Sequence, residues 1–63
     1  MKTEIIGDAF DLIESFTRVF DIDVDELIND LKKLKEKYPQ YKRLYLEDIG
    51  VDEVVYQVIG EKS

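Results

Sequence analysis

The chain has 63 residues, of which 44% are apolar and 38% are charged, and its formal net charge is −6. A chain of this length has enough apolar material for one core, so we expect a single domain over residues 1–63. The sequence contains no cysteine and no histidine. Disulfides are therefore excluded, and the usual protein ligands of zinc, haem and iron–sulfur clusters are missing. We expect no metal site and no cofactor.

A core in so short a chain usually supplies about 3–5 kcal/mol of stability unless a partner chain adds to it, so self-association is expected. Asp8, Asp11 and Glu14 interrupt the apolar run that a signal peptide needs. No stretch approaches the roughly 20 apolar residues of a membrane span. We therefore expect a cytoplasmic protein with no membrane partner. Abundant Lys, Glu and Asp with few Asn, Gln and Met residues also indicate a thermophilic source.

Residues 3–20 carry apolar side chains at spacings of three and four, which is typical of an amphipathic helix. A second apolar stripe lies one residue further on, so the apolar face is wider than one neighbouring helix would cover. We predict a central helix, packed either in the core of its own chain or across a dimer interface. The candidate self-association face consists of Ile5, Ala9, Leu12, Phe16 and Val19.

A second helix is predicted to begin after Asp23, whose carboxylate can accept from the unpaired amides of the first turn. Its apolar seam is narrow and consists of Leu27, Leu31, Leu34 and Tyr38. The helix is expected to end at Tyr38, because Pro39 disfavours a helical conformation in the residue before it.

The last third of the chain is open to two interpretations. Pro39 can begin a third helix that ends near Asp48, with Tyr41, Leu44, Tyr45 and Ile49 on one face. Residues 48–55 are similar to residues 21–28, which predicts a further acid-capped helix over 52–59. The predicted fold class is therefore all-α, a compact bundle of three to four short helices. The alternative is an α+β fold with a C-terminal strand near 52–59, where strand-prone valines and an isoleucine gather.

Charge is distributed unevenly along the chain. The net charge is −7 over residues 1–31, +5 over residues 32–43 and −4 over residues 44–63. A basic segment between acidic ends can bind a phosphate backbone, an acidic protein or the acidic part of a second copy. Tyrosines interleaved with these bases would suit stacking on nucleic-acid bases, although a solvated lysine face is the simpler explanation. The candidate basic and aromatic patch consists of Lys35, Tyr38, Tyr41, Lys42, Arg43 and Tyr45.

The sequence matches motifs for calcium binding, DNA binding and catalysis only in part or not at all. Asp21, Asp23 and Asp25 alternate as at the start of a calcium loop, but Glu26 and Lys32 stand where that loop needs a glycine and a bidentate acid. The spacing around Asp23 also fits a helix-turn-helix, in which acidic side chains would face the bases. No nucleophile stands beside a base motif, and no glycine-rich phosphate loop is present. We predict no catalytic residues, no enzyme activity and no small-molecule substrate.

The sequence thus predicts a non-enzymatic protein-interaction or regulatory module that self-associates, with a protein partner, a homodimer or both. The alternative is a nucleic-acid-associated protein that uses the segment 32–43, although a net charge of −6 repels a polyanion. A third hypothesis is an acidic decoy that occupies a nucleic-acid-binding protein through the acids on the outer face of the first helix.

Overall fold

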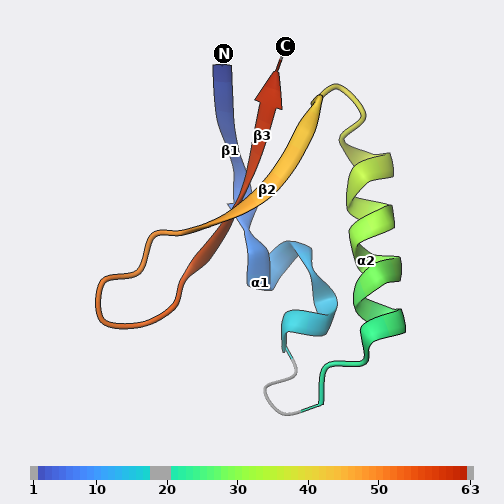
Figure 1. Ribbon diagram of the computed structural model, residues 1–63, viewed down its shortest axis with the longest axis vertical. Helices are drawn as coiled ribbons and strands as arrows, with labels where there is room; N and C mark the ends of the chain where they lie inside the picture. The colour runs from blue at the N-terminus through green and yellow to red at the C-terminus, as the bar shows by residue number, and fades with distance from the viewer. Residues whose placement is uncertain (1, 18–20, 63) are drawn as a thin grey trace.

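A computed structural model describes residues 2–17 and 21–62 of the chain (Figure 1). The elements in chain order are the strand β1 (Lys2–Asp8), the short helix α1 (Ala9–Leu12), the 3-10 helix η1 (Glu14–Thr17), the helix α2 (Val24–Lys37) and the strands β2 (Arg43–Asp48) and β3 (Tyr56–Lys62). The fold is α+β, with three antiparallel strands in one sheet and one main helix. The predicted helical bundle is wrong.

The sheet is built around β3, which pairs antiparallel with β1 on one side and with β2 on the other. Directly paired residues share a face, and successive residues alternate between faces. Val58 lies opposite Leu46 and belongs to the buried core, whereas the next residue, Ile59, lies opposite Tyr45 and Ile5 on the other face. Both outer strands, β1 and β2, therefore present one unpaired edge of the described sheet.

The buried core lies where the sheet meets the helices. It consists of Ala9, Ile13, Leu34 and Val58, with partly buried apolar residues around them. The helix α2 packs mainly against η1 rather than across the face of the sheet. The molecule is consequently flat, with principal extents of 36 × 29 × 14 Å. In Figure 1, α2 stands to one side of the strands, and the connection to β2 joins the two at one end.

The predicted second helix is confirmed. The side chain of Asp23 accepts hydrogen bonds from the backbone amides of Asp25 at 2.9 Å and Glu26 at 3.2 Å, which satisfies two of the unpaired donors of the first turn. The helix ends at Lys37, and Tyr38 is its C-terminal cap. Lys35 and Lys37 lie in its last turn, where positive charge is favourable.

The predicted helix over 3–20 is wrong. Its first part forms β1, where Gly7 sits beside a register shift and opposite Val58; a glycine inside a helix would cost about 1 kcal/mol. A helix begins only after Asp8, whose side chain accepts from the amide of Phe10 at 2.8 Å. The pairing of β1 with a strand about fifty residues later decides its conformation, and a local periodicity does not contain that information.

The predicted third and fourth helices are also wrong. In β2, Leu44 and Leu46 lie on the core side of the sheet, while Arg43, Tyr45 and Glu47 lie on the other side. This two-residue alternation was misread as the face of a helix. The segment predicted as a helix over 52–59 contains a loop and the first part of β3 (Tyr56–Lys62). Gly50 stands where the similar segment has Asp23, so no capping side chain is present there.

Candidate functional site

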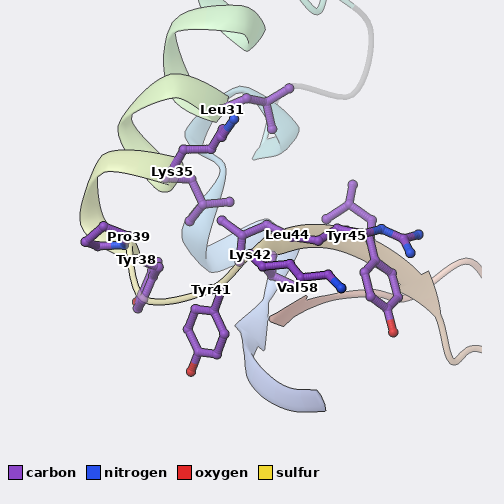
Figure 2. Close-up of a pocket in the computed structure, with 12 residues that line it drawn as sticks. Leu31, Lys35, Tyr38, Pro39, Tyr41, Lys42, Leu44, Tyr45 and Val58 are labelled. Carbon is purple, nitrogen blue, oxygen red and sulfur yellow. The ribbon is translucent and has the colours of Figure 1, made fainter. Parts of the chain in front are cut away.

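A groove of about 600 Å³ lies between α2 and β2 (Figure 2). The helix contributes Leu31, Leu34 and Lys35, and its C-terminal end contributes Tyr38 and Pro39. On the strand side, every residue of the range 41–46 borders the groove. Because successive residues of a strand point to opposite faces, a groove that touches all of them runs along the edge of β2. We call this feature the α2–β2 groove.

The floor of the α2–β2 groove is apolar. Leu34 and Val58 belong to the buried core and line the groove from below, together with the half-buried Leu44. Leu31 and Leu46 are each 37% exposed and stand on opposite sides of it. The groove therefore exposes one margin of the hydrophobic core, which is a common property of surfaces that bind other proteins or ligands.

The rim of the groove is basic, with Lys35 on α2 and with Lys42 and Arg43 at the start of β2. Arg43 lies near two neighbours: its Nη1 is 3.4 Å from Oε2 of Glu61, and its guanidinium carbon is 4.6 Å from the centre of the Tyr45 ring. Glu61 is only 5% exposed, so Arg43 compensates a nearly buried carboxylate. Lys35 and Lys42 are both exposed and give the rim its outward charge.

The structure brings all six residues of the predicted basic and aromatic patch to the border of this groove. They are Lys35, Tyr38, Tyr41, Lys42, Arg43 and Tyr45. Their side chains do not form one surface, however. Figure 2 shows the Tyr45 ring pointing away from α2, as its place opposite Ile59 requires. Tyr38 and Tyr41 stay together, with ring centres 6.4 Å apart and planes inclined at 53°.

Tyr41 is fixed at one end of the groove by residues from both ends of the chain. Its hydroxyl donates to Oε2 of Glu4 at 2.9 Å, and Nζ of Lys62 lies 2.5 Å from Oε1 of the same carboxylate. The hydrogen bond from Lys62, with that from Tyr41, holds the pKa of Glu4 below its ordinary value. The hydrogen bonds to Glu4 raise the pKa of Tyr41 and of Lys62. Glu4 and Lys62 were not among the predicted site residues, because no local pattern links positions so far apart.

The predicted self-association face is not gathered on one surface. Ile5 lies in β1 and is 66% exposed, whereas Ala9 is buried in the core. Leu12 and Phe16 pack partly buried against that core. Val19 lies outside the described residues. The helix that would have aligned these five side chains is absent from the described part of the chain. The residues that are described therefore do not form the common face that was predicted.

Two acidic residues, the N-cap of α2 and one in the middle of that helix, have structural roles. Asp23 caps the helix, and Oδ2 of Asp30 accepts from the amide of the buried Ser15 at 3.0 Å. Within residues 2–17 and 21–62, no cluster of three acidic side chains is arranged to hold a metal ion. None of the helices in these ranges has the length and apolar character that crossing a bilayer requires.

Comparisons of the chain with protein-family models, with curated proteins and with solved structures gave no match. The α2–β2 groove is therefore the feature of the molecule that bears on function.

Proposed function

We propose that the protein is a non-enzymatic interaction module whose α2–β2 groove binds a short apolar and acidic segment of a partner protein. The observation that carries this proposal is an apolar floor with a basic rim, set along an edge of β2 that pairs with no strand of the described sheet. Apolar side chains of the partner would cover Leu31 and Leu46, and its carboxylates would meet Lys35 and Lys42. The apolar contacts would supply affinity, and the contacts between opposite charges would supply selectivity and faster association.

The extent of exposed surface supports a partner. The solvent-accessible area is 4902 Å², whereas folded monomers of 7.4 kDa expose about 4200 Å² on average. The excess follows from the flat shape, in which α2 lies beside the sheet and leaves the margin of the core open. A partner segment in the groove would bury part of this apolar surface.

The strand edge adds backbone chemistry to the groove. An edge strand presents N–H and C=O groups that no neighbouring strand pairs, and an extended peptide can bond to them while its side chains enter adjacent pockets. Because the groove follows β2 from Arg43 to Leu46, a bound segment in extended form would lie within reach of these groups. Backbone hydrogen bonds depend little on the partner's exact sequence. The pattern of apolar and acidic side chains would therefore determine which partner segments bind.

Nucleic acid fits the same site less well. Arg43 already compensates Glu61, and the hydroxyl of Tyr41 already bonds to Glu4. The net charge of −6 opposes the approach of a polyanion. The acidic-decoy hypothesis depended on acids along a helix over residues 3–20, and most of that segment forms other structure. A protein segment therefore remains the better-supported ligand.

Fluorescence anisotropy with three labelled probes tests the proposal. The probes are a short peptide of alternating valine and glutamate, a matched peptide of alternating valine and lysine, and a single-stranded oligonucleotide of mixed sequence. We expect the valine–glutamate peptide to bind, with an affinity that falls as salt rises. The double variant Lys35→Glu with Lys42→Glu should weaken this binding by roughly tenfold or more, since charge reversal replaces attraction by repulsion.

The matched control is Lys32→Glu with Lys33→Glu, which changes the net charge equally on exposed positions of α2 that do not line the groove. It should bind the peptide nearly as well as the wild-type chain does. Arg43 is left unchanged, because its removal would take away the positive charge that compensates the nearly buried carboxylate of Glu61. Equal loss in both double variants would show only a long-range charge effect and contradict the proposed site. Oligonucleotide binding near physiological salt that only the groove variant loses would establish the nucleic-acid alternative instead.

A further inference from the structure

The loop between β2 and β3, residues 49–55, is held in a defined shape. The carboxylate of Asp48 accepts from the amide of Gly50 at 2.9 Å and from the amide of Val55 at 3.2 Å. The amide of Ile49 donates to the carbonyl of Val55 at 2.8 Å and closes the base of the loop. A Cβ atom at Gly50 would overlap the carbonyl oxygen of Glu53, so the tight turn requires glycine. We call residues 49–55 the hairpin loop.

The surface of the hairpin loop is both apolar and acidic. Val51 is 96% exposed, and Ile49 and Val54 are also exposed. Asp52 and Glu53 stand between the two valines and are exposed as well. An organised loop that presents apolar side chains to water has the chemistry of a binding element. Its pattern of valines beside carboxylates is the pattern that the α2–β2 groove is suited to accept.

We propose that the hairpin loop of one copy of this chain docks into the α2–β2 groove of a second copy. Three observations support this pairing. The acids of the loop, Asp52 and Glu53, complement the bases of the rim, Lys35 and Lys42. Val51 offers an apolar contact for the groove floor. A groove of about 600 Å³ lies within the range of about 300–1000 Å³ that is typical of small binding sites, and so suits a loop tip.

The contact must be intermolecular. In Figure 1 the hairpin loop projects from one side of the molecule, and α2 forms the opposite side. One copy therefore cannot fill its own groove with its own loop. Each copy carries one donor surface and one acceptor surface, so association through them is head-to-tail and proceeds to a closed ring or an open chain. Because the hydrogen bonds of Asp48 already organise the loop, docking has little loop entropy to overcome.

This inference rests on the proposed function, since it names a particular occupant of the same groove. It also replaces the self-association face that the sequence suggested, of which Val19 lies outside the described residues and the rest is divided between β1 and the core. Raising the salt concentration should weaken the association, because the paired charges are exposed.

A mixing experiment by analytical ultracentrifugation tests the proposal with two complementary variants. The loop variant carries Val51→Ser, Asp52→Asn and Glu53→Gln, and keeps an intact groove. The groove variant carries Lys35→Glu and Lys42→Glu, and keeps an intact loop. All five substitutions are at exposed positions, so both chains should fold, which circular dichroism verifies. Asp21→Lys with Glu36→Lys is the control for altered charge elsewhere.

The wild-type chain and the control should form dimers or larger species as concentration rises, while each test variant alone should sediment as a monomer. An equimolar mixture of the two variants should give a 1:1 heterodimer that grows no further, because only one competent loop and one competent groove remain. Association of either variant alone, or a monomeric mixture, would overturn the inference.

Adding the valine–glutamate peptide to the loop variant separates the two proposals. If it binds while the wild-type chain stays monomeric, the groove functions with another partner; if it fails to bind, the proposed function falls too.

Discussion

The hydroxyl of Tyr41 donates a hydrogen bond to Oε2 of Glu4 at 2.9 Å, and this contact ties the segment after α2 to the first strand of the sheet. Lys62, from the last strand, approaches the same carboxylate and lies 5.9 Å from the centre of the Tyr41 ring. The end of the α2–β2 groove is thus positioned by charges from both termini of the described chain.

Acid should weaken this arrangement selectively. The pKa of Glu4 is lowered in the folded protein, first by Lys62 and then by Tyr41. Its contribution to stability is therefore complete above the ordinary value of 4.5 and disappears as pH falls through the lowered value. Urea unfolding at several pH values should show the wild-type chain more stable than Glu4→Gln at neutral pH, with the difference vanishing on acidification. A difference that does not change with pH would contradict the role given to this carboxylate.

Gly60 is expected to tolerate no side chain. A Cβ atom there would lie 2.5 Å from Cδ1 of Tyr41, so the ring would have to move. We expect Gly60→Ala to lower the free energy of unfolding by about 1–3 kcal/mol, as overpacking usually does. Gly7→Ala is the comparison, because its new methyl group would meet only the end of the Leu12 side chain, with Cδ1 at 3.1 Å and Cγ at 3.6 Å. If the cost comes from the ring, it should shrink when Gly60→Ala is made in a Tyr41→Ala background.

The contact between Ser15 and Asp30 offers two substitutions with opposite expectations. The amide of Ser15, a residue with 0% exposure, donates to Asp30, while its hydroxyl has no hydrogen-bond partner among the described residues. Asp30→Ala should cost about 1–3 kcal/mol, since it leaves a buried amide unpaired. Ser15→Ala should be neutral or stabilising, because it removes an unpaired buried hydroxyl. Thermal unfolding of both variants measures this contrast, and an unstable Ser15→Ala protein would show that the hydroxyl is satisfied.

Local signals in the sequence predicted only part of the fold. The helix α2 was predicted correctly because Asp23 and Pro39 mark its two ends within the segment itself. The strands β1 and β2 were missed, and β3 overlaps only the alternative of a strand near 52–59. The stability of a strand comes from partners far away in the chain, as the pairing of Ile5 with Ile59 shows. One local signal was overlooked, namely the alternation of Leu44 and Leu46 with charged and aromatic neighbours, which is typical of a strand.

Part of the candidate site could be predicted from the sequence. Interleaved bases and tyrosines drew attention to residues 32–43, and the six patch residues do border one groove. Its apolar floor could not be anticipated, because Leu44 and Val58 come together only through the pairing of β2 with β3. The roles of Tyr41 and Arg43 were equally hidden, since Glu4 was placed in the predicted helix over 3–20 and Glu61 in no predicted element.

The central claim is that the α2–β2 groove is where a protein segment binds. Amide chemical-shift mapping of the isotope-labelled chain, titrated with the valine–glutamate peptide, tests it most directly. We predict that the largest shifts fall along residues 41–46 and at Leu31 and Lys35, with slower hydrogen exchange at the edge of β2. Shifts centred on the opposite face, at Ile5 and Ile59, or no shifts at all, would contradict the claim.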